Sequence, residues 1–346
     1  MAPSLSAGWA GVEIRTRTFF TRSLIAHLQS RAKQVISPAM DRPVIVVTGP
    51  TASGKSALAL ALAERHRGTV INADAMQTYD AFPILTAQPS EAERSRVPHA
   101  LYGVLPLSET LSTARWRALA DVEIERCLAE GRTPILCGGS GLYLRTLMQG
   151  IATIPDTPAG LRDQANSEWI SLGADAFRAR LAEKDPAIVA RLKPGDRQRH
   201  VRAWEVWVAT GRPLSTWQAG EGEPSRWHFV TVLLAPERGW LRDRIEKRFD
   251  AMLASGVLAE VRHVFDRAPD PRWPGLKAHG ASEVFAHFRG QLSLEDARRI
   301  GIDHTRQYAK RQMTWFRHQM APDVVVDSTS DLSLEQTEKL LTKTEA

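Results

Sequence analysis

The sequence predicts an α/β fold in which a parallel sheet carries a phosphate-binding loop and is interrupted by an all-helical insertion. Two observations predict the sheet. Residues 44–48 form a β-branched apolar run of the kind found in buried parallel strands. A glycine-rich stretch, 49–56, follows and leads into strong helix formers at 57–64. The insertion is predicted because strand-like runs vanish between about 153 and 220, where short helical patterns follow one another.

Composition fits one large domain plus a smaller one. The 346 residues are 43% hydrophobic and 24% charged, and no apolar run approaches the length of a membrane span. The formal net charge of +6 permits a polyanionic partner. The two cysteines, Cys127 and Cys137, lack metal-ligand spacing, so we expect packed thiols in a reducing, cytoplasmic compartment and no membrane association.

The stretch after the first strand has the chemistry of a P-loop, which makes the expected class P-loop NTPase-like. Its glycines let successive backbone N–H groups turn onto an anion, and the helix N-terminus adds a positive dipole end. Lys55 adds a full charge, and the Ser56 hydroxyl suits Mg²⁺. The loop predicts a bound di- or triphosphate without saying which; it comprises Gly49, Pro50, Thr51, Ala52, Ser53, Gly54, Lys55 and Ser56.

The next elements lead back to the same edge of the sheet. A second strand at 69–73 ends in Asp74, which should lie near the phosphate because the carboxyl ends of parallel strands meet at the ligand crevice. Residues 75–99 predict a long loop or short broken helices, followed by a strand at 101–105 and a helix at 113–130. A strand at 134–137 then enters the turn 138–141. That turn brings further N–H groups to the crevice or is a simple sharp turn.

Within the insertion, helices are expected at 161–171, 175–183, 186–192 and 196–210, the last capped by Asp196 and ended by Gly211. One short segment of it is strongly basic and is followed by Trp204 and Trp207. A polyanion site or a solvated face both fit; the cluster comprises Arg191, Lys193, Arg197, Arg199, His200 and Arg202.

After the insertion, a strand at 229–234 precedes a helix that should end near Gly256. Arg244 and Arg248 share one face of that helix. They either clamp an anion opposite Lys55 or form salt bridges with Asp243, Glu246 and Asp250. The last third is expected to be helical, with a capping box at 293–296 and a long helix in which basic and aromatic residues alternate, as in a nucleic-acid groove or an ordinary packed helix.

These patterns divide the chain into four parts. Residues 1–40 are basic and acid-poor, and we expect them to be a disordered or dispensable extension. A transit peptide, a nucleic-acid-binding arm and a start codon chosen too early, with Met40 as the alternative start, also fit. Residues 41–152 and 221–330 form the core with C-terminal helices, 153–220 the insertion, and 331–346 a tail.

The motifs together resemble tRNA dimethylallyltransferases. The resemblance covers about 42–318 and rests on motifs that occur in the family's order: 49–56, 74–77 with Tyr79, 138–143, 196–199, 244–248 and 305–312. Such enzymes prenylate N6 of the adenosine immediately 3′ of the anticodon. The resemblance implies that the loop holds dimethylallyl diphosphate rather than ATP, with Mg²⁺ near Ser56. It also implies that tRNA is the partner, and we expect the protein to be a monomer.

The resemblance also implies roles for individual residues. Asp74 accepts the N6 proton, Lys55 and Arg248 with Arg244 stabilise the departing diphosphate, and Thr51 and Ser140 line the reaction pocket. The tRNA contacts it implies are Asp74, Ala75, Met76 and Gln77 at the adenine, Ser140, and, on the anticodon arm, Arg162, Gln198, Arg199, His200, Val201 and Arg202.

Departures from the family's pattern occur at a few positions. Ala75 stands where Ser is usual, Gln88 where Lys is usual, and Ala281 where Tyr or Arg is more usual; Ser140 replaces a Thr but keeps the hydroxyl. Two rival functions share the loop and its metal: a kinase or NTPase acting on a nucleotide, and a non-catalytic RNA-binding module switched by a nucleotide. Asp74 would also suit the kinase as a Mg²⁺ ligand.

Overall fold

The core of the protein is a single parallel sheet. We describe a computed structural model, covering residues 42–327 except 153, 156, 159, 221 and 223, together with 335 and 337. The leader 1–40 and nearly all of the tail 331–346 lie outside these residues. Six strands pair in parallel in the order β3-β2-β4-β1-β5-β6. They are β1 (Val44–Thr48), β2 (Gly68–Asn72), β3 (His99–Ala100), β4 (Thr133–Gly138), β5 (Phe229–Leu234) and β6 (Val324–Val326).

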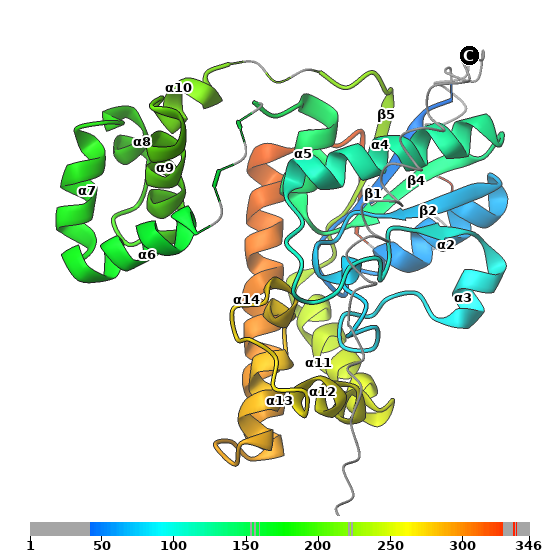
Figure 1. The fold of residues 1–346 in the computed structure, drawn as a ribbon. Helices are drawn as coiled ribbons and strands as arrows, with labels where there is room; N and C mark the ends of the chain where they lie inside the picture. Colours follow the sequence, from blue (N-terminus) through cyan, green and yellow to red (C-terminus); the bar gives the residue numbers. More distant parts are fainter. Residues whose placement is uncertain are drawn as a thin grey trace, which may run out of the picture.

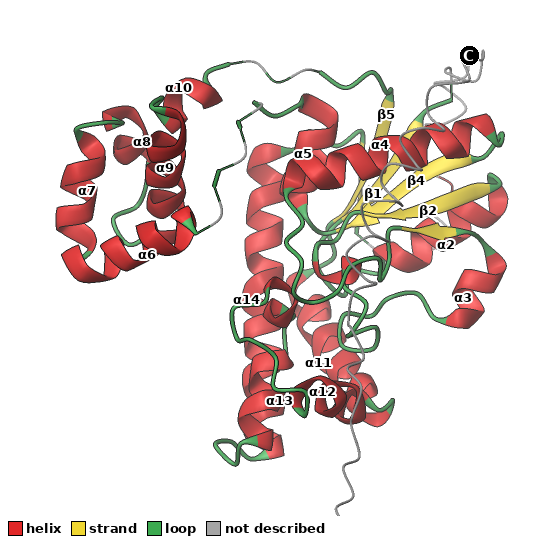
Figure 2. Ribbon diagram, viewed as in Figure 1, coloured by secondary structure: helices red, strands yellow, loops and turns green. Residues whose placement is uncertain are grey.

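Helices cover both faces of this sheet (Figure 2). Since side chains alternate along a strand, Ile45 and Val47 of β1 face one layer while Val44 and Val46 face the other. Helix α2 (Lys55–Arg65) packs on the first face, and α4 (Thr113–Ala129) and α5 (Gly141–Gln149) on the second. A short helix, α3 (Glu91–Arg96), precedes β3. The predicted P-loop NTPase-like parallel sheet is confirmed.

A group of C-terminal helices stands at one end of the sheet. Its longest member, α14 (Leu294–Gln319), packs against α11 (Arg238–Ala254), α13 (Ala281–Phe288) and α5. In Figure 1 it runs from beside α13 up to α5 at the sheet. Outside the insertion, the remaining described elements are α12 (Val257–Phe265) and two 3₁₀ turns, η2 (Met76–Thr78) and η3 (Pro274–Lys277). None of the helices in the described part of the chain has both the length and the apolar character needed to cross a membrane.

The insertion forms a separate helical body, confirming the predicted all-helical insertion. It stands apart from the sheet in Figure 1, and Trp169, Phe177, Leu181 and Trp204 lie in its own apolar core. Asp196 caps α9, accepting a hydrogen bond from the N–H of Arg199, and the helix ends at Gly211 in the left-handed region (φ 66°). The helices are α6 (Leu161–Leu172), α7 (Ala174–Ala182), α8 (Pro186–Arg191), α9 (Arg197–Thr210) and α10 (Leu214–Gln218).

Two expected elements are wrong. The strand predicted at 101–105 is replaced by β3, because Leu101 (φ 64°) and Gly103 (φ 61°) turn the chain away from β2. The N–H groups of residues 103–105 instead donate to the carbonyl oxygens of Gln77 and Thr78. The last third is not entirely helical, because β6 pairs with β5 and extends the sheet.

Candidate active site

The P-loop joins β1 to α2 through backbone conformations that need small residues. Gly54, the N-cap of α2, is left-handed (φ 93°), and so is Ala52 (φ 63°). At Gly49 a Cβ atom would lie 2.6 Å from the carbonyl oxygen of Leu234 in β5. The loop is therefore tied closely to the neighbouring strand, with its N–H groups at the start of a helix.

Lys55 is the buried cation of this loop. The residue is only 8% exposed, and it donates a long hydrogen bond of 3.3 Å from Nζ to the carbonyl oxygen of Pro50. Burial lowers the pKa of Lys55, while the nearby Asp74 carboxylate acts in the opposite direction. A desolvated ammonium group whose hydrogen bond to Pro50 is long is ready to bind an anion.

A second, half-buried cation comes from α11. The Arg248 guanidinium donates from Nη1 to Oγ1 of Thr51 at 3.2 Å. Burial lowers the pKa of Arg248, which the negative charge of Asp74 partly opposes and the positive charge of Arg244 reinforces. Arg244 itself lies over the ring of Trp240 at 5.2 Å. Only Arg248 of the predicted pair therefore faces the P-loop directly.

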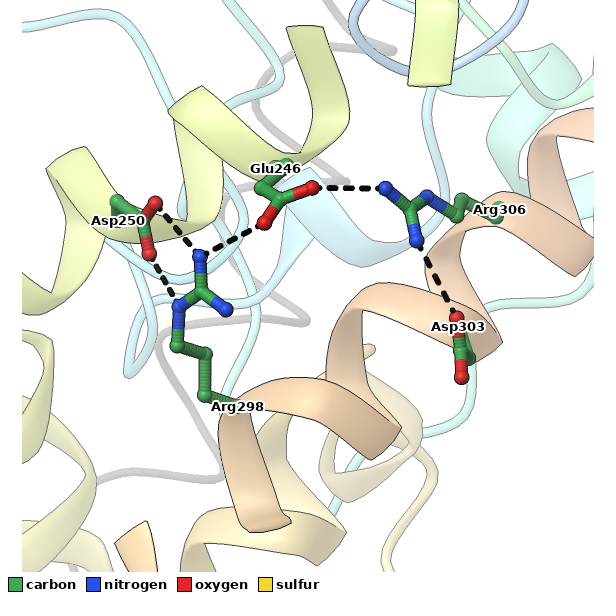
Figure 3. A network of polar contacts seen from close by, with 5 residues as sticks. All are labelled: Glu246, Asp250, Arg298, Asp303 and Arg306. Atoms are coloured by element: carbon green, nitrogen blue, oxygen red, sulfur yellow. Dashed lines mark hydrogen bonds and ion pairs between the residues drawn. The ribbon is translucent and has the colours of Figure 1, made fainter. Parts of the chain in front are cut away.

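Two of the acids considered as salt-bridge partners of Arg244 and Arg248 pair instead with arginines of α14. Glu246 accepts hydrogen bonds from both Arg298 and Arg306 of α14, and Asp250 accepts two from Arg298 (Figure 3). The acids of α11 thereby hold it to α14, and the network leaves Arg248 to the P-loop.

Asp74 lies in the tight turn that follows β2. Its N–H donates to Oδ1 of Asn72 at 2.8 Å, and its own Oδ1 accepts from the N–H of Met76 at 3.0 Å. The Ser140 hydroxyl accepts from the N–H of Ala75 at 2.9 Å. A Cβ atom at Gly138 would meet the backbone of Ala73 at 2.1 Å, so the second glycine turn packs directly against the Asp74 turn. No residue of 138–141 belongs to the described pocket wall, and the N–H of Ser140 donates to the carbonyl oxygen of Ala73 at 3.2 Å, so the turn supports the Asp74 turn from outside the wall.

These elements enclose one pocket. Eight predicted site residues line it: Thr51, Ala52, Lys55, Ser56, Asp74, Met76, Gln77 and Arg248. The other predicted loop residues, Gly49, Pro50, Ser53 and Gly54, shape the backbone, and Ala75, Ser140 and Arg244 lie outside the pocket wall as described. The wall also includes residues to which we assigned no role from sequence: Leu85, Thr86, Ala87, Ile245, Phe249, Met252, His279, Thr305 and Tyr308.

The loop from Leu85 to Gln88 is held in place by side-chain amides. Gln77 donates from Nε2 to the carbonyl oxygens of Thr86 and Ala87, and Gln88 donates to that of Tyr79. Gln88, which stands where the family usually has lysine, thus supports the pocket wall.

The predicted RNA contacts of the insertion lie away from the pocket, and none belongs to its described wall. Gln198, Arg199 and Arg162 are exposed, while Arg202 donates to the buried carboxylate of Glu205 at 2.9 Å. His200 and Val201 are buried, at 0% and 1% exposure, and their side chains belong to the insertion's interior rather than its surface.

One buried residue that sequence reasoning gave no role connects both glycine loops. Gln312 of α14 accepts from the N–H of Thr51 at 2.8 Å and donates to the carbonyl oxygen of Gly139 at 2.9 Å. Its signal in the sequence is a glutamine at helical spacing from buried Ala309 and Phe316.

The IPP transferase family model matches residues 77–319 of the chain. The protein belongs to this family. A relative from Rhodospirillum centenum, a tRNA dimethylallyltransferase, is 52% identical over 282 residues, which are 81% of this chain and 90% of the relative. These matches favour the transferase over the kinase.

Solved structures of IPP transferases share the fold. The tRNA isopentenylpyrophosphate transferase of Bacillus halodurans matches with a TM-score of 0.63 and 30% identity, over 88% of this chain and 97% of that one. A eukaryotic dimethylallyltransferase acting on tRNA matches with a TM-score of 0.73 and 26% identity, over 87% and 77%.

Proposed function

We propose that this IPP transferase moves the dimethylallyl group of dimethylallyl diphosphate to N6 of the adenosine on the 3′ side of the tRNA anticodon, releasing diphosphate. The observation that carries the proposal is a single pocket in which the carboxylate of Asp74 faces two cations, buried Lys55 and half-buried Arg248. Such a pocket separates a leaving-group side from a proton-accepting side.

On the leaving-group side, Lys55, Arg248 and the P-loop amides would hold the diphosphate. Negative charge grows on the diphosphate as its bond to the allylic carbon breaks, and buried cations stabilise that charge more strongly than cations in water. Leu85, Phe249 and Met252 give the adjoining wall an apolar surface suited to the dimethylallyl group.

On the acceptor side, Asp74 would take a proton from the attacking N6 amine. An exocyclic amine is a weak nucleophile, and a positioned carboxylate is the base that the reaction needs. The turn is oriented by the hydrogen bond that the N–H of Asp74 donates to Asn72 and by the one that its carboxylate accepts from the N–H of Met76. The adenine must leave its stack to reach this pocket, where Met76 and Gln77 form part of the wall.

Mg²⁺ fits the leaving-group side. The Ser56 hydroxyl lines the pocket beside Lys55 and offers the oxygen donor that this cation prefers, and the phosphates and water would supply the others. When bound, Mg²⁺ neutralises part of the diphosphate charge.

The insertion would grip the anticodon arm. Exposed Arg162, Gln198 and Arg199, with Arg202, suit phosphate contacts, whereas buried His200 and Val201 would set the position of α9. We further propose a cytoplasmic monomer. The buried thiols Cys127 and Cys137 suit a reducing compartment.

Transfer from two labelled donors tests the function. With dimethylallyl diphosphate labelled in the allyl group, a tRNA transcript carrying adenosine 3′ of the anticodon should acquire label, and a transcript with guanosine there should not. With ATP labelled in the γ-phosphate, neither should. Phosphoryl transfer from ATP without prenyl transfer would overturn the proposal.

A further inference from the structure

Gln312 is a primary amide on the buried face of α14. It is 5% exposed and shares that face with Ala309 and Phe316. Burying an amide among apolar residues is unfavourable unless its polar atoms are hydrogen-bonded. Both ends of this amide are bonded to backbone atoms: Thr51 belongs to the P-loop, which lines the pocket, and Gly139 belongs to the second glycine turn, which adds no residue to the described wall.

The amide occupies a space that only a glycine leaves open. A Cβ atom at Gly139 would lie 2.2 Å from Nε2 of Gln312. Gly141 is equally close to α14, since a Cβ atom there would lie 2.2 Å from the ring of Trp315. The second glycine turn is therefore shaped to receive this side of α14.

Each end of the Gln312 amide leads to a different side of the pocket. Oε1 holds the backbone of Thr51, whose hydroxyl receives Arg248. Nε2 holds Gly139, next to Ser140, whose hydroxyl holds Ala75 beside Asp74. One side chain thus joins the leaving-group side to the acceptor side.

We propose that Gln312 is a positioning residue that sets the distance between the diphosphate held by the P-loop and the carboxylate of Asp74. It acts through Thr51 and Gly139 and is not part of the described pocket wall. The inference rests on the proposed transfer reaction, in which a misplacement of about 1 Å costs on the order of 10²-fold in rate.

Two substitutions separate positioning from simple filling of the core. Gln312→Met keeps the length of the side chain and loses both hydrogen bonds. Gln312→Glu keeps an oxygen for the N–H of Thr51 but sets a second oxygen against the carbonyl of Gly139. Gln319→Met, on the exposed end of the same helix, is the matched control. Single-turnover transfer is measured per folded molecule. The folded sites are counted from the stoichiometry of inorganic diphosphate binding at saturation, which does not depend on affinity.

We expect transfer to fall at least about 10-fold in both Gln312 variants and not in Gln319→Met. Inorganic diphosphate should bind less tightly to Gln312→Met than to Gln312→Glu, because only the latter still holds Thr51. Wild-type single-turnover rates in both variants would overturn the inference while leaving the proposed function intact; absence of transfer in the wild-type protein would refute the function itself.

Gly139→Ala gives an independent test should the Gln312 variants fail to fold. Its methyl group must displace the amide, so the single substitution should slow transfer like Gln312→Met. In the double variant Gln312→Ala, Gly139→Ala the methyl group no longer meets the amide and keeps only a 3.3 Å contact with the carbonyl oxygen of Gly49. Its added effect should then be much smaller than in the presence of Gln312. Full additivity of the two substitutions would contradict the inference.

Discussion

The core pocket and the helical insertion present their charges in opposite ways. In the pocket, Lys55 is 8% exposed and faces Asp74 and Arg248. In the insertion, the side chain of Arg199 is 74% exposed and its ion pair with Asp196 spans 3.5 Å. Buried charges interact strongly with a developing charge, whereas exposed ones contribute affinity that salt screens. The core is therefore suited to chemistry and the insertion to holding RNA.

The largest effect should come from Asp74→Asn. Asparagine keeps the size and one acceptor oxygen but cannot take the N6 proton, so the chemical step should slow by ~10²–10⁴-fold. Single-turnover transfer measures this step, with tRNA and dimethylallyl diphosphate binding measured separately. Lys55→Ala is the contrast, because it should weaken diphosphate binding and transfer together. Normal transfer by Asp74→Asn would remove the general base from the mechanism.

Trp204→Ala should loosen the helical insertion without loosening the sheet, and so tests whether the two regions are stable independently. Trp204 packs against Phe177 and Trp207 in the insertion's own core, and truncating such a residue typically costs ~3–5 kcal/mol. Hydrogen exchange followed by mass spectrometry should show faster exchange in 161–218 and unchanged exchange in the sheet. Transfer RNA affinity should fall while dimethylallyl diphosphate affinity stays. Equal loosening of the sheet would show that the regions unfold as one.

Arg199→Ala should have a smaller effect, confined to RNA affinity. Losing one phosphate contact lowers the slope of log affinity against log salt by about 0.7–0.9. Dimethylallyl diphosphate affinity should not change. Arg267→Ala, an exposed arginine beyond α12, removes the same charge and should leave the slope as it is. An identical slope in both variants would exclude the Arg199 contact.

The smallest effect concerns the ion pairs between α11 and α14. Hydrogen bonds from Arg298 lower the pKa of Asp250 below 3.8. Its contribution to stability is therefore present above pH 3.8 and lost as pH falls through the lowered value. With half of that side chain exposed, we expect less than about 1 kcal/mol. Urea unfolding of wild type and Asp250→Asn should differ at pH 6 and converge in acid; a constant difference would contradict this.

Sequence predicted the parts of the pocket whose chemistry is local. The carboxyl ends of parallel strands lie at one edge of the sheet. A glycine loop between a strand and a helix, or an aspartate at the end of a strand, can therefore be placed at that edge from sequence alone. Sequence also placed the insertion, since its helical spacing differs from that of the strands on either side.

Contacts between distant segments could not be predicted in this way. Gln312 lies 261 residues from Thr51, and no local pattern states which loop a buried glutamine meets. Arg244 and Arg248 share a helical face, yet only packing decides that one lies on Trp240 and the other at Thr51. Strand β6 has three residues, and its pairing with β5 outweighs the helical pattern before it.

The place of β1 in the middle of the sheet has a consequence for synthesis on the ribosome. One edge of β1 is covered by β4, but the other waits for β5, so the chain must be made as far as Phe229 before Val44 finds its partner. All five helices of the insertion emerge during that interval. The nascent protein therefore carries an unpaired apolar strand edge while the insertion leaves the ribosome, and such edges are where growing chains aggregate or recruit chaperones.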